Sequence, residues 1–238
     1  MNWVDEEKRK VEMLEIETIR PILQDAGMLA RYHKYNQLIL PISYHKPEGI
    51  HGVSHVRRTL FLALLMAYLD KLSAQHTRIL AYASIYHDIG RENDGADEYH
   101  GYDSYQKVIE QGFLSRLADK EVGIIKELIE RHAVHDAHAF SLEAIDGDIR
   151  DEVGFLLRYF KDADGLDRVR IHDLNVAYLR TEIARKMPLV AQQLLENSKD
   201  LPYVFRYLPE LSILLDTENH KINNDKESII PPSIKQKV

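Results

Sequence analysis

The chain of 238 residues contains no cysteine. This absence excludes disulfide bonds, thiolate metal sites and cysteine nucleophiles. Any metal ion would therefore be bound by histidine and carboxylate side chains. The absence of cysteine fits a cytoplasmic chain, and we expect a cytoplasmic location.

The chain also lacks an apolar run long enough to cross a membrane. Its longest run, Leu60 to Leu69, lies between charged residues and is much shorter than the roughly 20 residues that a bilayer requires. The first eight residues lack the basic and then apolar order of a signal peptide. We therefore expect a soluble protein with no membrane partner, in which Leu60 to Leu69 forms part of a buried helix.

A strong positive charge is absent as well. The formal net charge is -7 and the isoelectric point is about 5.9. A protein that binds long nucleic acid needs an extended basic track, so this balance argues against extended nucleic-acid binding. It leaves room for a local basic pocket that binds a small phosphorylated substrate.

Alternation of apolar and polar residues with a period of two, typical of β-strands, is nearly absent, whereas apolar residues recur with helical spacing along most of the chain. We predict an all-α fold in a single domain over residues 1–216, with the sequence motifs between about 50 and 185. Residues 217–238 are polar, contain Pro231 and Pro232, and are predicted to form a mobile tail. The predicted helices cover residues 4–22, 29–40, 55–69, 73–88, 102–111, 118–132, 150–167, 175–186, 189–198 and 203–215, with a loop over residues 91–101.

The most informative pattern is the dipeptide His87-Asp88 at the polar end of an apolar helix. His55 precedes it near the start of another apolar helix, and Asp164 follows near the end of a third. Two imidazoles and two carboxylates are ligands that divalent Mn, Fe, Co, Mg, Zn or Ni accepts. Four such ligands leave coordination positions open for water and substrate, and a metal ion can then activate the water.

The order His55, His87-Asp88, Asp164 resembles the HD superfamily of metal-dependent phosphohydrolases. The segment His87-Asp88-Ile89-Gly90-Arg91 is similar to the family's HD-Ile-Gly-Lys pattern, with arginine in place of lysine. The segment Asp164 to Arg168 resembles its final Asp-x-Leu-Asp motif. The resemblance implies an all-α helical bundle in which His55, His87, Asp88 and Asp164 bind one metal ion and Asp88 is able to bridge to a second.

His100 and His132 lie between the HD pair and the last aspartate, where dinuclear members of the superfamily carry two more histidines. The resemblance thus makes them candidate ligands of a second metal ion and, with Asp88, candidate catalytic residues. His100 could instead donate a proton or a hydrogen bond to a phosphate, and His132 could simply cap a helix C-terminus. His135 is a further candidate, whereas the other histidines, including His51, form no pattern.

Guanidinium groups bind phosphate oxygens in pairs, which makes arginines near these motifs candidate substrate ligands. The candidates are Arg58, Arg91, Arg131 and Arg168, with Lys107 a weaker one. Arg131 and Arg168 could equally form surface ion pairs. Asp167 could pair with an arginine and orient the site without contacting metal.

The resulting functional hypothesis is a metal-dependent phosphohydrolase. It would act on a phosphate ester, a nucleotide or related small phosphate, through a metal-activated water with one or two metal ions per chain. Monoesterase and diesterase activity are not distinguished, and a homodimer is left open. Two alternatives are a mixed-valent di-iron oxygenase, which needs His100 and His132 as ligands, and a non-catalytic nucleotide-binding sensor on an HD scaffold.

Overall fold

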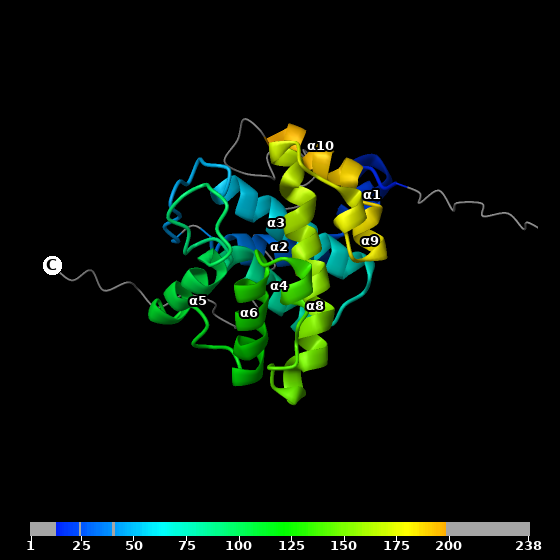
Figure 1. Ribbon diagram of the computed structural model, residues 1–238. Helices are drawn as coiled ribbons and strands as arrows, with labels where there is room; N and C mark the ends of the chain where they lie inside the picture. The colour runs from blue at the N-terminus through cyan, green and yellow to red at the C-terminus, as the bar shows by residue number, and fades with distance from the viewer. Residues whose placement is uncertain (1–12, 24, 40, 199–238) are drawn as a thin grey trace, which may run out of the picture.

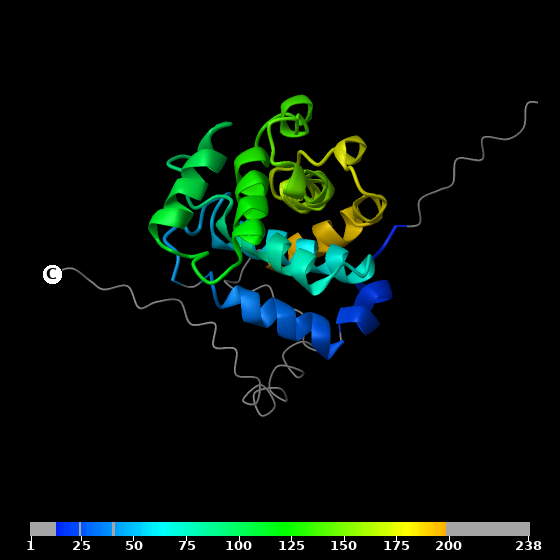
Figure 2. The ribbon, with the colours of Figure 1, turned by 90° about the horizontal axis from the view of Figure 1, so that it is seen from below.

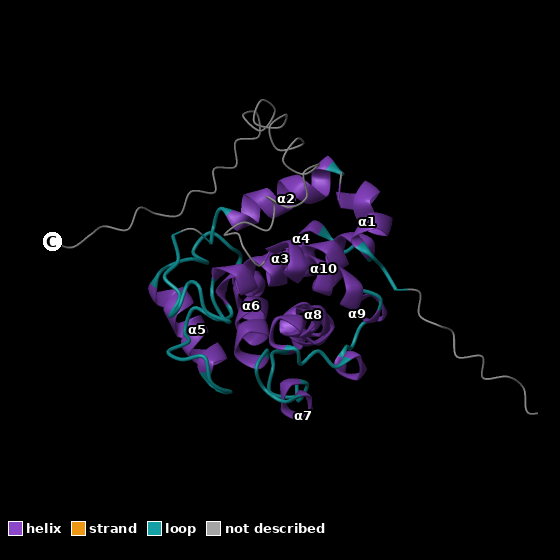
Figure 3. Ribbon diagram, turned by 90° about the horizontal axis from the view of Figure 1, so that it is seen from above, coloured by secondary structure: helices purple, strands orange, loops and turns teal. Residues whose placement is uncertain are grey.

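The computed structural model describes residues 13–23, 25–39 and 41–198, which form helices and connecting segments without any strand (Figures 1 and 3). The predicted all-α class is confirmed. The helical elements are α1 (Ile16–Leu23), α2 (Ala26–Asn36), α3 (Val53–Leu69), α4 (Ala74–Tyr86), α5 (His100–Glu110), α6 (Asp119–Arg131), α7 (Asp136–Ala139), α8 (Gly147–Leu166), η1 (Asp167–Ile171), η2 (Val176–Tyr178), α9 (Glu182–Arg185) and α10 (Pro188–Ser198).

Helix α3 forms the centre of the bundle. It packs against α2, α4 and α8, and α2 lies on the side of α3 and α4 opposite α8 (Figure 2). Every residue from His55 to Ala67 is buried, as expected for a helix that is apolar on all sides. Burial of each large apolar side chain here contributes roughly 1.5–3 kcal/mol to folding, so α3 is a rigid base for residues near its start.

Helix α4 begins directly after Ser73 and ends at the His87-Asp88 motif. The Ser73 side chain accepts a hydrogen bond from the backbone N–H of His76 at 3.0 Å, and His87 is the C-cap residue. Gly90 then lies directly against α5, where a Cβ atom would come within 2.1 Å of the Ser104 backbone nitrogen. Glycine at this position therefore allows the end of α4 to pack tightly on α5.

The predicted helix over residues 175–186 is wrong. This segment instead contains η2, an extended turn and the short α9. The backbone N–H groups of Arg180 and Thr181 donate to the buried carboxylate of Asp162 at 2.9 and 2.7 Å. These bonds hold the chain in a non-helical conformation, so a tertiary contact overrides local helix propensity.

Smaller differences concern helix boundaries. Helix α5 begins at His100, inside the loop predicted for residues 91–101, and the short α7 was not predicted. Pro21 lies within α1, which continues to Leu23. The first part of the predicted N-terminal helix, the helix predicted over residues 203–215 and the predicted tail at 217–238 fall outside the described residues.

Within the described part of the chain, none of the helices combines the length and apolarity that crossing a membrane would take.

Candidate metal centre

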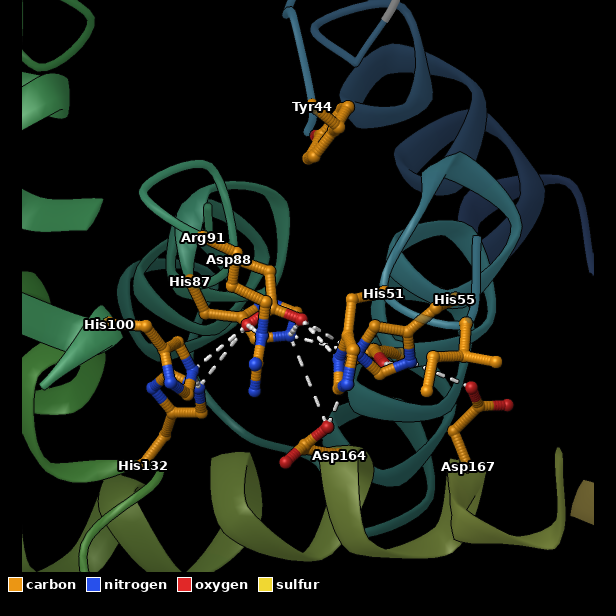
Figure 4. A network of polar contacts seen from close by, with 12 residues as sticks. Tyr44, His51, His55, His87, Asp88, Arg91, His100, His132, Asp164 and Asp167 are labelled. Carbon is orange, nitrogen blue, oxygen red and sulfur yellow. Dashed lines mark hydrogen bonds and ion pairs between the residues drawn. The ribbon is translucent and has the colours of Figure 1, made fainter. Parts of the chain in front are cut away.

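Five helices meet at one point through their ends. His55 lies in the first turn of α3, Asp164 lies in the last turn of α8, and His87 and Asp88 directly follow α4. His100 is the first residue of α5, and His132 is the C-cap of α6. Figure 4 shows Asp88 in the middle of these side chains, with Asp164 reaching toward it from α8.

One carboxylate oxygen of Asp88 faces the histidines at the start of α3 and the end of α4. Its Oδ2 atom lies 3.5 Å from His55 Nε2, 3.4 Å from His87 Nε2 and 3.1 Å from His51 Nδ1. Donor atoms of His51, His55 and Asp88 all lie within 4.8 Å of one another. Asp88 Oδ2 is therefore positioned to share a cation with these imidazoles.

The second oxygen of Asp88 faces the opposite direction. Its Oδ1 atom lies 3.0 Å from His100 Nε2 and 3.7 Å from His132 Nε2, and it accepts a hydrogen bond from Arg91 Nε at 2.9 Å. The two oxygens of one carboxylate thus serve two separate histidine pairs. This arrangement is that of a carboxylate able to bridge two positions.

The tautomers of the first histidine pair follow from their outer contacts. His55 Nδ1 donates to Asp167 Oδ2 at 2.8 Å, and His87 Nδ1 donates to the carbonyl of Ser84 at 2.9 Å. In the neutral rings each Nε2 is then left with a lone pair. These two Nε2 atoms are only 3.0 Å apart, so two acceptors face each other.

The second pair, His100 and His132, repeats this arrangement. His132 Nδ1 donates to the carbonyl of Ile129 at 2.6 Å, and His100 Nδ1 donates to the carbonyl of Asp97. The Nε2 atoms of this pair are 2.8 Å apart, and both face the Asp88 carboxylate. Ligating histidines are typically oriented through their outer N–H groups in this way.

Convergent lone pairs repel one another unless a proton or a cation lies between them. Four Nε2 lone pairs point at a carboxylate that is 1% exposed, so acceptors outnumber donors in a buried space. A divalent metal ion satisfies such a donor set, and nitrogen with carboxylate oxygen suits several of them. The side chains at the centre therefore fit a metal ion.

Asp164 completes the first group. Its Oδ1 atom lies 3.4 Å from His55 Nε2 and 4.0 Å from His87 Nε2, and its side chain is 28% exposed, whereas both histidines are 1% exposed. The centre thus opens to solvent beside Asp164. Burial raises the pKa of its carboxyl, but electrostatic attraction to His55, His87, His132 and Arg170 outweighs this effect and lowers it.

The electrostatics favour the metal-binding forms of Asp88 and His132, whereas they favour protonation of His87 when no cation is present. Burial alone raises the pKa of Asp88, but His87 and hydrogen bonds from the other histidines hold it well below its usual range. Burial lowers the pKa of His132 to about 4, although its contact with Asp88 opposes this, so the ring is neutral at pH 7. Burial also lowers the pKa of His87, but the adjacent Asp88 outweighs it and raises the value.

Asp167 forms an outer support for His55. It accepts two hydrogen bonds from Arg58, at 2.6 Å from Nε and 3.1 Å from Nη2, besides the one from His55. Arg170 Nη1 lies 3.4 Å from the same carboxylate. Asp167 therefore pairs with arginine and orients a candidate ligand, the role suggested by its position in the sequence.

The second histidine pair depends on the close approach of α5 and α6. A Cβ atom on Gly101 would lie 2.4 Å from the carbonyl oxygen of Ile129, so only glycine allows this spacing. Gly101 follows His100, and Ile129 accepts the hydrogen bond from His132. The contact between the two helices thus brings these two rings together.

Lys161 ties the end of α6 to α8. Its Nζ atom donates to the carbonyls of His132 at 2.9 Å and Val134 at 2.6 Å, and lies 3.3 Å from Asp136 Oδ1. Lys161 lies one turn before Asp164 on α8. The lysine therefore fixes the backbone that carries His132 relative to the helix that carries Asp164.

A cleft of about 310 Å³ opens over the centre and contains cationic side chains. Arg91, Arg168 and Arg170 contribute to its wall together with His51. Arg170 is held by hydrogen bonds to the carbonyls of Ile50 and Asp167 at 2.7 and 3.2 Å. Pre-positioned guanidinium groups next to carboxylates and imidazoles can bind and neutralise an anion such as phosphate.

The structure does not bring two of the predicted phosphate ligands to this cleft, and this corrects the prediction. Arg58 is buried in its pair with Asp167. Arg131 donates to Glu127 and to backbone carbonyls that follow α6, including those of Ala139 and Ser141. Lys107, the weaker phosphate candidate, donates to the Ile89 carbonyl. His135, the further candidate histidine, caps α7.

Sequence reasoning missed His51 and Arg170. His51 precedes His55 by four residues and, although it lies before α3, points to the same carboxylate as the His55 ring. Arg170 Nη2 lies 3.4 Å from His51 Nδ1. The four-residue spacing of His51 and His55 was the one available signal, and it needed the loop geometry to become meaningful.

Comparisons of the chain with protein-family models, with curated proteins and with solved structures found no match.

Proposed function

We propose that this protein is a metal-dependent phosphohydrolase that acts on a phosphate ester, a nucleotide or related small phosphate. The observation that carries the proposal is the convergence of four imidazole Nε2 lone pairs on the two oxygens of Asp88, beside a cleft with three arginines. The motif order that resembles the HD superfamily supports the same reading. A cytoplasmic location belongs to the proposal as well.

The residues of the centre have separable tasks in this proposal. His55, His87, Asp88 and Asp164 hold the first metal ion, and Asp88, His100 and His132 hold a second where one binds. Bound divalent metal ions lower the pKa of water and polarise a phosphoryl oxygen.

The protein supplies the remaining electrostatics. Arg91 and Arg170 are held in place by hydrogen bonds and so meet phosphate oxygens without first losing side-chain freedom. Arg168 pairs with Asp173, but both side chains are largely exposed, at 48% and 63%, so this ion pair is weak. Arg168 can therefore exchange its partner for a phosphate at little cost.

The test has two parts. Elemental analysis of protein purified without chelator should give one or two of Mn, Fe, Co, Mg, Zn or Ni per chain. The loaded protein should release phosphate from a panel of nucleotides and aryl phosphates, and Asp88→Ala should abolish the release while keeping the helical circular dichroism. Asp119→Ala, on the exposed start of α6, is the matched control and should retain activity. Unchanged turnover in Asp88→Ala would refute the proposal, and saturable nucleotide binding without turnover would favour a sensor.

One observation favours a second candidate, a mixed-valent di-iron oxygenase. His100 and His132 face Asp88 in the same way as the first histidine pair, so two metal ions per chain fit the donor set. Two irons per chain with consumption of oxygen on an added polyol or phosphonate would support this candidate. One metal ion per chain would exclude it.

A further inference from the structure

A second and larger cleft lies next to the metal centre. Its volume is about 790 Å³, within the usual range for small-molecule sites. It shares His132, Asp164 and Arg168 with the smaller cleft. The two clefts therefore meet at Asp164, on the side where the centre opens to solvent.

The wall of the large cleft has a substantial apolar part. Val134, Leu174, Tyr178 and Leu179 are among the residues that line it. Tyr178 belongs to η2 and is 73% exposed. An aromatic ring left open at a cleft wall gains free energy when a flat ring stacks on it.

The charged groups of the large cleft are mostly neutralised within the protein. Lys161 is 7% exposed and donates to carbonyls and to Asp136. Arg180 forms ion pairs with Asp136 at 2.6 Å and Asp162 at 3.0 Å. Because these cations already have buried or half-buried partners, the cleft is poorly suited to a chain of several phosphates.

The two clefts thus form one binding site with a cationic part and an apolar part. Arg91 and Arg170 line only the small cleft, whereas Leu174, Tyr178 and Leu179 line only the large one. A ligand that spans both has an anionic end at the metal centre and an apolar, ring-containing end beside η2. Arg168, which lines both clefts, lies where the two ends join.

We propose that the large cleft binds the organic group of the substrate and that the substrate is a phosphate monoester of a ring-bearing alcohol, of the nucleoside monophosphate type. Tyr178 is the specificity residue that stacks on the ring. This inference rests on the proposed function, because it takes the phosphate to lie at the metal centre. It goes further by assigning the second cleft and by disfavouring polyphosphate substrates.

The experiment measures binding to the full chain loaded with the metal found by elemental analysis. Calorimetry compares inorganic phosphate with methylenephosphonate analogues of the four common nucleoside 5′-monophosphates, whose ester position cannot be hydrolysed. At least one analogue should bind about tenfold or more tightly than phosphate. Tyr178→Ala should weaken that analogue about fivefold or more, the effect expected for loss of one stacked ring, and leave phosphate binding within about twofold.

Tyr102→Ala is the matched control, because Tyr102 is 55% exposed on α5 and lines neither cleft. It should leave both affinities unchanged. Equal binding of phosphate and all four analogues, or equal effects of the two tyrosine variants, would overturn the inference while leaving the phosphohydrolase proposal intact. Absence of binding by phosphate and by every analogue would overturn both.

Discussion

The buried pair of Asp167 and Arg58 should be among the most sensitive points of the fold. Both side chains are almost inaccessible, at 1% and 6% exposed, and two hydrogen bonds join them. Asp167→Asn keeps the size of the side chain but removes its charge. Arg58 would then lose the charge of this carboxylate, and removal of one partner of a buried pair costs about 3–5 kcal/mol.

Asp173→Asn provides the comparison. Asp173 also pairs with an arginine in this region, Arg168, but the two side chains are 63% and 48% exposed. Loss of such an exposed pair costs about 0–1 kcal/mol. The effect of the same chemical change on the unfolding free energy is therefore expected to differ by at least about 2 kcal/mol between the two sites.

Urea unfolding followed by circular dichroism, with chelator present, measures this difference without a contribution from bound metal. Burial raises the pKa of Asp167, but hydrogen bonding from His55 and the charge of Arg58 lower it on balance. A lowered pKa in the folded state gives stability that is present above the unfolded value of about 4 and is lost as the pH falls through the folded value. Measurement at pH 7 therefore samples the full effect.

A second readout separates the support of His55 from general stability. Loss of an outer partner of a ligating histidine weakens metal binding about 10–100-fold, so Asp167→Asn should also bind its metal more weakly than Asp173→Asn does. The double variant Arg58→Met with Asp167→Asn should recover part of the lost stability, since the buried charge of Arg58 is then removed together with that of Asp167. Unfolding free energies of Asp167→Asn and Asp173→Asn that agree within 1 kcal/mol would refute the reasoning.

Three further predictions concern the metal centre and its supports. Metal ion at a free concentration of 100 times its dissociation constant should raise the unfolding free energy by about 2.7 kcal/mol. A melting temperature that changes with neither added metal nor added chelator would contradict a metal site. Gly101→Ala should destabilise the fold by about 1–3 kcal/mol in urea, because its Cβ would lie 2.4 Å from the Ile129 carbonyl, whereas Gly147→Ala, with open space around it, should not. Lys161→Met should leave buried carbonyls at the end of α6 without their donor and so lower the unfolding free energy by about 1–3 kcal/mol. It should also reduce the amount of metal bound beside His132. A variant with wild-type stability and wild-type metal stoichiometry would show that the lysine is dispensable.

The sequence was informative where a site residue lies at the end of a strongly apolar helix. A helix with a clear core face carries or directly precedes each of His55, His87 and Asp164. The ends of these helices could therefore be located in the sequence, and the approach of the three side chains to one another could be inferred. The structure brings donor atoms of these three residues within 4.8 Å of one another. Helix packing in the core decides this part of the site, and helix packing leaves a periodic trace in the sequence.

The partners of the arginines could not be predicted in the same way. Arg58 was expected to bind phosphate, but it is one helical turn from His55 and is directed to Asp167 by the crossing of α3 with η1. Arg170, which was not selected, takes the place at the cleft. A long side chain can reach several partners, so its choice depends on tertiary distances that no local pattern records.

The two histidine pairs depend on different parts of the fold, which has a consequence for metal binding. The pair His55 and His87 is carried by α3 and α4, at the centre of the core, and is supported by Asp167. The pair His100 and His132 is carried by α5 and α6, whose spacing depends on Gly101 and on the lysine bridge from α8. Perturbation of α5 or α6 should therefore remove one metal position and leave the other, with Asp88 remaining a ligand through Oδ2. Loss of Asp88 itself should remove both metal positions, because its Oδ2 atom faces the pair His55 and His87 and its Oδ1 atom faces the pair His100 and His132.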